Sequence, residues 1–274
     1  MRFFQLKFRK YWMAIEAGRV INLGSSNYFS KEYASWTEAK KVATGYDFSP
    51  IFEKGLAATR LVRDGLAVYE RDTVIFDRRE IFYPLLSWLL YAASNQNGEL
   101  RVLDFGGALG TSYFQNKLFL SGLRHVLWGV VEQDQYIKIG QAEFESSELK
   151  FFDSSQGCVE AIDPNFLLLS GVLQYIEEPY KELDKLLGLG IPYVIIDRTM
   201  AHRFGGDRVV IQTVPPSIYN ASYPVWLLSA NNIEQCINRN GYEIIDVYDP
   251  HPGSFFGPSE LESPYIGWCL KKLT

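Results

Sequence analysis

The stretch of sequence that decides the fold is Arg101-Val102-Leu103-Asp104-Phe105-Gly106-Gly107-Ala108-Leu109-Gly110-Thr111. A short apolar strand runs directly into a glycine-rich turn, and a helix is expected to follow. Glycine lets the backbone turn sharply and approach a ligand closely, and the first N–H groups of a helix lack intrahelical partners. Asp104, at the carboxyl end of the strand, would face the same crevice. The stretch therefore predicts a nucleotide-binding turn.

The spacing of the small residues indicates which kind of turn this is. A dinucleotide-binding turn needs glycine at its first, third and sixth places, and counted from Gly106 the latter two are Ala108 and Thr111. An acidic-x-Gly-x-Gly-x-Gly pattern fits better, and here the chain resembles the class I S-adenosylmethionine-dependent methyltransferases. Ala108 departs from that pattern, and its methyl group could crowd the methionine end of the ligand. The turn residues expected to bind the cofactor are Asp104, Gly106, Gly107, Ala108 and Gly110.

Three more predicted strands end in polar residues, in the order that a nucleotide site requires. Residues 127–132 end in Glu132, whose carboxylate can accept hydrogen bonds from both ribose hydroxyls. Residues 150–153 end in Asp153, where the resemblance implies an adenine contact. Residues 165–170 end in Ser170 and lead into Gln174 and Tyr175, a segment that borders the reacting methyl group in the family. Each residue could instead belong to an ordinary loop or packed helix, so the ordered series carries the prediction.

The last two predicted strands distinguish this fold from the dinucleotide-binding one. A fifth strand is expected over 192–197, a sixth over 242–247 and a last over 264–270. No crossover helix fits between the final two, so they should pair antiparallel. The resemblance implies an α/β Rossmann-like methyltransferase fold, with a seven-stranded, mostly parallel sheet and an antiparallel C-terminal hairpin.

The chain before residue 96 reads as a mostly helical cap. Helices are expected from a cap at Ser35 to residue 41, from Ser49 to residue 65, and over 79–93. The polar residues 94–98 mark a boundary between a cap over 1–95 and a cofactor-binding domain over 96–274. Residues 69–72 are either a solvated helix end or a site from which Arg71 reaches the carboxylate of the cofactor.

The first residues form a second amphipathic pattern. Apolar residues at helical spacing, flanked by basic ones, predict a helix that packs on the domain or a partner subunit, or contacts an anionic membrane surface. The residues that form its apolar face are Phe4, Phe8, Tyr11, Trp12 and Ile15.

Residues 197–228 break the βα rhythm and are expected to be a long functional loop. Ligands of open α/β sheets bind beyond the carboxyl ends of the strands, so this insertion is the predicted acceptor pocket. Aromatic rings beside arginine suit a sugar ring. The residues expected to bind the acceptor are Arg198, Gln212, Tyr219, Tyr223 and Trp226.

The resemblance narrows to a bacterial family of methyltransferases associated with surface-polysaccharide and O-antigen biosynthesis. It rests on residues 69–72, the Asp-Phe-Gly-Gly turn, and residues 170–175, 197–199 and 223–226. It implies methyl transfer to a sugar-containing acceptor. His202 is the first candidate for a general base because histidine titrates near neutrality. Asp197 is the alternative, Tyr175 could orient the acceptor, and His251 is the weakest candidate.

Composition fits a folded domain and disfavours nucleic-acid binding. The 274 residues are 47% hydrophobic and 22% charged, with a net charge of −5 that implies no broad basic surface. The three cysteines and three histidines show no metal-ligand spacing. The longest apolar run, 84–93, is too short to span a bilayer, and no secretory signal follows the first basic residues, so a cytoplasmic protein is expected.

Three functions remain open from the sequence. The first is a methyltransferase that uses S-adenosylmethionine. The second is a nicotinamide-dependent enzyme acting on sugar nucleotides, which the glycine spacing and the terminal hairpin disfavour. The third is a noncatalytic partner that retains the fold, which Ala108 and the lack of an obvious base make reasonable.

Overall fold

The structure is a computed structural model that describes residues 29–44, 48–71, 74–76, 81–214, 221–250, 255–256 and 263–273. The apolar helix expected over residues 4–15 lies outside these residues, as do Tyr219 and His251. Of Arg71, only the backbone is described.

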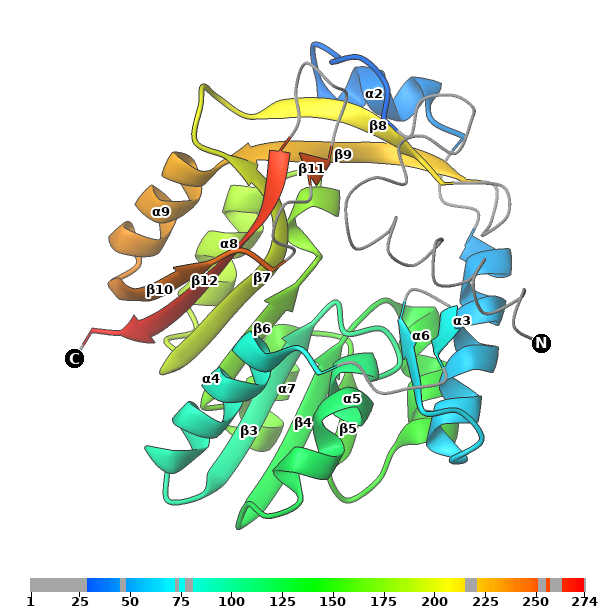
Figure 1. Cartoon of the computed structure of the whole chain (residues 1–274), viewed down its shortest axis with the longest axis vertical. Coiled ribbons are helices and arrows are strands. Elements are labelled where there is room, and N and C mark those ends of the chain that lie inside the picture. The colour runs from blue at the N-terminus through cyan, green and yellow to red at the C-terminus, as the bar shows by residue number, and fades with distance from the viewer. Residues whose placement is uncertain are drawn as a thin grey trace, which may run out of the picture.

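A seven-stranded run forms the centre of the molecule, in the order β10-β12-β7-β6-β3-β4-β5 (Figure 1). Its members are β3 (Glu99–Phe105), β4 (His125–Val131), β5 (Leu149–Phe152), β6 (Phe166–Ser170), β7 (Tyr193–His202), β10 (Tyr242–Tyr248) and β12 (Ser263–Lys272). The strands from β5 to β7 are parallel, whereas β12 runs antiparallel to β7 and β10. The short β11 (Phe255–Phe256) also pairs with β12. The predicted Rossmann-like methyltransferase fold is therefore confirmed.

Helices cover both faces of this sheet because its central strands are apolar on both sides. On β3, Val102 belongs to one apolar cluster and Leu103 to the other, as the two-residue period of a strand requires. The first cluster contains residues of α4 (Tyr83–Ser94), α5 (Thr111–Leu120), α6 (Asp134–Ile139) and the π-helix η2 (Gly140–Phe144). The second contains residues of α7 (Ser155–Ile162), α8 (Pro179–Leu187) and α9 (Ala230–Arg239). The sheet is thus the middle layer of three.

The segment before residue 96 is helical with one exception. The helices α2 (Trp36–Val42), α3 (Phe48–Arg63) and α4 confirm the three expected ones to within a few residues, and Ser35 caps α2 by accepting a 3.2 Å bond from the Glu38 N–H. The helix end expected at 69–72 is wrong. Residues Tyr69–Arg71 form β1, which pairs antiparallel with β2 (Val74–Phe76). Pairing with the apolar, β-branched Val74 and Ile75 outweighs the helical propensity of the charged residues.

The long loop expected over 197–228 is also wrong. The strand β7 continues to His202, and β8 (Arg208–Thr213) pairs antiparallel with β9 (Ser222–Ser229). Pro224 lies inside β9 opposite Ile211. A proline within an apolar segment argues against a strand in the sequence, which is why β9 was missed. The upper part of Figure 1 shows β8 and β9 beside α2. Ser229 precedes α9 as expected, but its side chain makes no capping bond.

The described part of the chain contains no helix long and apolar enough to cross a membrane. Cys158, Cys236 and Cys269 are all buried free thiols.

Candidate functional site

The turn after β3 has the backbone conformation that its spacing predicts. The φ angles of Gly106, Ala108 and Gly110 are +74°, +50° and +88°, so alternate residues lie in the left-handed region. A Cβ at Gly106 would also lie 2.8 Å from Cγ2 of Val172, in the turn after β6. Ala108 takes up a glycine conformation at a cost of about 1 kcal/mol. The turn is therefore of the predicted type although one glycine is replaced.

Asp104 supports this turn from within the protein. It is buried, and its Oδ2 accepts a 2.9 Å hydrogen bond from the indole N–H of Trp128 on β4. Gly107 packs against the carboxyl group, since a Cβ at Gly107 would lie 2.5 Å from Asp104 Cγ. Burial raises the pKa of Asp104 to about 7, against the opposing effect of the Trp128 bond. Asp104 thus titrates near neutrality directly beneath the turn.

Glu132 comes from the end of β4 to the same turn. Its Oε1 accepts from the backbone N–H of Ala108 at 3.1 Å, and its Oε2 accepts from that of Gln133 at 2.8 Å. Burial raises the pKa of Glu132, and these two backbone donors oppose the rise. A carboxylate oxygen has a second lone pair, so each oxygen can still accept from a ligand hydroxyl. The strand-terminal acid therefore lies at the turn with capacity to accept further hydrogen bonds.

Asp153 follows β5, the next strand along the same edge. Phe152 pairs with Val131 of β4, which sets Asp153 at the level of Glu132. The side chain of Asp153 is exposed and accepts a 3.1 Å bond from the hydroxyl of Ser154, which caps α7. Asp104, Glu132 and Asp153 thus lie on neighbouring strand ends.

On the other side of β3, the end of β6 and the middle of β7 meet in a buried polar group. Asp197 is buried, and its two oxygens accept from the hydroxyls of Ser170 at 2.8 Å and Tyr248 at 2.9 Å. Arg198 donates from Nε to Ser170 Oγ at 3.1 Å and lies 3.5 Å from Asp197. Both carboxylate oxygens of Asp197 are therefore engaged by neighbouring side chains. Its role as a base stays a prediction.

Gln174 and Tyr175 lie in η3 (Leu173–Tyr175), the short 3₁₀ turn after β6, and differ sharply in exposure. Gln174 is 1% exposed and donates from Nε2 to the carbonyl oxygen of Arg198 at 3.2 Å, while its Oε1 is buried with no hydrogen-bond partner. Tyr175 is 38% exposed. One turn thus presents a buried amide on one side and an exposed phenol on the other.

Tyr175 joins the aromatic side chains of the β8–β9 pair. Its hydroxyl donates to Gln212 Oε1 at 3.1 Å, and its ring meets that of Tyr223 edge to face, with centroids 5.5 Å apart. Gln212 and Tyr223 are register partners in β8 and β9. Trp226 donates to the carbonyl oxygen of Ile176 at 3.1 Å and stacks on Trp36 of α2 at 5.5 Å. Four of the six residues in this acceptor-side cluster were predicted, namely Tyr175, Gln212, Tyr223 and Trp226; Trp36 and Ile176 were not.

His202 does not join either group. It lies at the far end of β7, five residues and about 16 Å of strand beyond Asp197. It is buried at 9% exposure, with Nε2 unpartnered, and burial lowers its pKa. Its neighbour in the parallel register is Ser229 at the start of α9. The structure therefore places His202 in the packing between β7 and β9, away from the turn.

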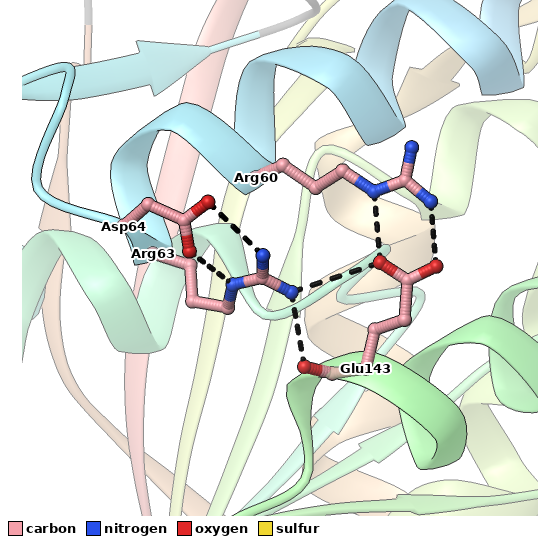
Figure 2. Close-up of polar contacts among 4 residues, drawn as sticks. All are labelled: Arg60, Arg63, Asp64 and Glu143. Carbon is pink, nitrogen blue, oxygen red and sulfur yellow. Dashed lines mark hydrogen bonds and ion pairs between the residues drawn. The ribbon is translucent and has the colours of Figure 1, made fainter.

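The segment before residue 71 is attached close to the cofactor turn. Glu70 of β1 is buried and accepts a hydrogen bond from the hydroxyl of Thr111, the first residue of α5. Figure 2 shows a second attachment, in which Arg60 of α3 donates from Nε and Nη2 to Glu143 of η2 at 2.8 and 2.5 Å. Arg63 donates to the Glu143 carbonyl oxygen at 3.1 Å. The bond from Arg60 lowers the pKa of Glu143.

Several of these contact residues carry no sequence signal. Trp128, Tyr248 and Trp36 are ordinary core aromatics in the sequence, and only the fold brings their polar or ring edges to the site. Glu70 lies in the charged segment 69–72 that the sequence analysis noted, but its hydrogen bond with Thr111 could not be predicted from sequence. Among the described residues, no three His, Cys, Asp or Glu side chains gather where they could hold a metal ion.

Comparison with known proteins finds likeness in structure only. No family model matches the chain, and no curated protein matches its sequence. A methyltransferase of Methanosarcina mazei described as SAM-dependent has a TM-score of 0.47 at 10% identity, covering 71% of this chain and 99% of its own. The magnesium protoporphyrin IX methyltransferase of Synechocystis, solved with bound SAM, has a TM-score of 0.45 at 11% identity, covering 92% and 100%. Likenesses of this size carry no conclusion about activity.

Proposed function

We propose that the chain is an S-adenosylmethionine-dependent methyltransferase acting on a small-molecule acceptor. One observation carries the proposal. The turn after β3 has left-handed residues at 106, 108 and 110, and the Ala108 N–H between them donates to the strand-terminal Glu132. A glycine cradle joined to a ribose-type carboxylate is what an adenosine cofactor requires.

The cofactor fits the groups around this turn. Side chains at 106, 107 or 110 would be strained or would collide with neighbours, so the backbone there stays open to a ligand. Glu132 would accept from the ribose hydroxyls, and Asp153 from the adenine amino group. Ser170 and Gln174 border the end of the cradle nearest β7. We further propose that residues 1–95 act as a cap, because Glu70 is bonded to the first residue of α5.

The acceptor would bind between the cradle and the β8–β9 pair. Tyr175 and Tyr223 offer ring faces and Gln212 an amide, a combination that suits a sugar ring. Such an acceptor agrees with a role in bacterial surface-polysaccharide biosynthesis, which we propose on the family resemblance.

For methyl transfer, the main task of the protein would be to align the acceptor with the methyl group of the cofactor. The sulfonium group of the cofactor supplies the driving force for transfer. Tyr175 would orient the acceptor oxygen or nitrogen toward the methyl carbon, and Asp197 would hold Ser170 and Tyr248 in place. His202 has no part in this proposal because of its distance from the turn.

A noncatalytic partner with the same fold is the second candidate. The observation in its favour is that both candidate bases, Asp197 and His202, are buried within the protein. A partner of this kind could still bind the cofactor. The nicotinamide-dependent alternative is weaker, because Thr111 stands where its third glycine is required.

Titration calorimetry with S-adenosylmethionine, S-adenosylhomocysteine, NAD and NADP tests the proposal. We expect saturable binding of the two sulfur compounds alone, accompanied by a rise in melting temperature. Binding of NAD or NADP instead would overturn it. Cofactor binding with no methyl transfer to any sugar nucleotide tried would favour the noncatalytic partner.

A further inference from the structure

We propose that Arg198 and Gln174 together hold the amino-acid end of the cofactor, the guanidinium binding its carboxylate and the amide oxygen of Gln174 accepting from its ammonium. The inference rests on the proposed function and deepens it, because it names the contacts that recognise the cofactor as an amino acid. It also moves Arg198 from the acceptor side, where the sequence placed it, to the cofactor side.

Arg198 is held in an uncommon conformation in the middle of β7. Its φ is +47°, in the left-handed region that a bulky side chain rarely adopts. The turn of the backbone brings the side chain over Gly171, where a Cβ would lie 3.9 Å from both Nε and Nη2. Bonding of Nε to Ser170, with Asp197 at 3.5 Å, fixes the plane of the guanidinium. Strain of this kind is concentrated at binding and catalytic sites.

The position of Arg198 relative to the glycine-rich turn follows from two observations. Its guanidinium lies over Gly171, in the turn after β6. Val172, one residue after Gly171, packs against Gly106 of the glycine-rich turn. Arg198 therefore lies beside the turn after β6, which itself packs against the glycine-rich turn after β3.

Gln174 supplies the complementary group. The carbonyl oxygen of Arg198 can only accept, so the amide nitrogen of Gln174 must face it, and the orphaned atom is necessarily Oε1. A buried acceptor without a donor is unfavourable in the protein alone. An ammonium group is a donor that would satisfy it. The bond from Gln174 to the Arg198 carbonyl oxygen therefore holds the unsatisfied acceptor on the backbone of the residue that carries the cation.

A fixed cation on Arg198 and an unsatisfied acceptor bonded to the backbone of the same residue match the charge pattern of an α-amino acid. A phosphate could pair with the Arg198 guanidinium but would leave Gln174 Oε1 without a hydrogen-bond donor. A neutral sugar hydroxyl could donate to Gln174 Oε1 but would not neutralise the charge of Arg198. The amino-acid end of the cofactor is the group that uses both.

The test compares three ligands by calorimetry on the full chain; two differ only in the carboxylate, and the third lacks the whole amino-acid chain and the sulfonium charge. S-adenosylmethionine has both charged groups, decarboxylated S-adenosylmethionine keeps the ammonium alone, and 5′-methylthioadenosine has neither. The variants are Arg198→Met and Gln174→Leu, with Arg203→Met as a matched control. Arg203 lies in the following turn, half exposed, and pairs with Glu234.

In the wild type we expect S-adenosylmethionine to bind about tenfold more tightly than its decarboxylated form, as a charged hydrogen bond implies. Arg198→Met should reduce that ratio to about one, and Arg198→Lys should restore part of it. Gln174→Leu should weaken both amine-bearing ligands by a similar factor of about ten. Binding of 5′-methylthioadenosine should not change in any variant, which also reports that each one is folded.

A ratio in Arg198→Met equal to that of the wild type and of Arg203→Met would overturn the assignment of the carboxylate and return Arg198 to the acceptor side. Unchanged binding of the amine-bearing ligands to Gln174→Leu would overturn the assignment of the ammonium. Failure of the wild type to bind any of the three ligands would overturn the proposed function itself, and this inference with it.

Discussion

The two sides of the candidate site are built in different ways. The proposed cofactor edge consists of a turn and strand ends, with Asp104, Gly106 and Ala108 close in sequence and Glu132 one βα unit further on. The proposed acceptor side collects Trp36, Tyr175, Gln212 and Tyr223 from four separate elements. The first depends on local backbone conformation, and the second on the packing of distant segments. Substitutions should therefore separate the two sides.

Removing the Trp36 side chain should have the largest effect, and that effect should be on stability. Its ring is buried against Trp226 and the β8–β9 pair, so Trp36→Ala should lower the free energy of unfolding by about 3 kcal/mol. Cofactor affinity in the folded fraction should stay within about twofold of the wild type, since no contact to the turn is lost. Denaturant unfolding and calorimetry measure the two quantities. A large loss of cofactor affinity would show that the sides are not separable.

Gly107→Ala should damage the cofactor edge. The added methyl would meet the buried Asp104 carboxyl group at 2.5 Å, and overpacking of this kind costs about 2 kcal/mol. The matched control is Gly122→Ala, where a Cβ meets nothing within 4 Å. Denaturant unfolding of both variants checks the difference. Equal stabilities would mean that the turn yields to a side chain and is not a rigid cradle.

The ionisation of Asp104 should make stability depend on pH. Burial raises its pKa from an ordinary 3.8 to about 7 in the folded protein. The protonated carboxyl group therefore contributes fully to stability below the ordinary pKa, and that contribution is lost as pH rises through the raised one. Between about pH 5 and pH 8, the wild type should lose about 2 kcal/mol relative to Asp104→Asn. Unfolding curves of the two proteins at several pH values test this. Parallel pH profiles would show that Asp104 titrates normally.

Glu132→Ala should act on cofactor binding more than on folding. Loss of the carboxylate removes two ribose contacts, and affinity for S-adenosylhomocysteine should fall about tenfold or more. Gln212→Ala, on the acceptor side, should leave that affinity within about twofold. Calorimetry on variants with native circular dichroism gives both values. If Glu132→Ala keeps its affinity, Glu132 only braces the Ala108 N–H.

The smallest expected effect concerns the missing glycine. At φ +50°, Ala108→Gly relieves backbone strain but adds chain entropy to the unfolded state, leaving a gain of about 0.5 kcal/mol. Denaturant midpoints measured in parallel should resolve it. A loss of stability would mean that the methyl group packs usefully in the turn.

The local features of the fold could be predicted from sequence because they depend on residues near one another. Strand-turn-helix spacing identified the cradle, and strand-terminal acids identified Glu132. The short connection before β12 predicted the antiparallel pair. Where a local pattern was ambiguous, the prediction was wrong. A loop was expected in place of β9 because of Pro224, and a helix end in place of β1 because of its charged residues. Pairing with a partner strand decided both cases, and a single segment carries no information about its partner.

The amino-acid sequence by itself determined the strand, the glycine-rich turn that follows it and the acid at the end of the next strand, because each follows from backbone conformation over a few residues. Only the tertiary structure decided that Asp197 is buried between two hydroxyls, that His202 lies far from the turn, and that Gln174 and Arg198 meet. Those outcomes depend on which surfaces exclude water when β6, β7 and the β8–β9 pair pack together. Burial is a property of the whole fold, so no stretch of sequence could assign these roles.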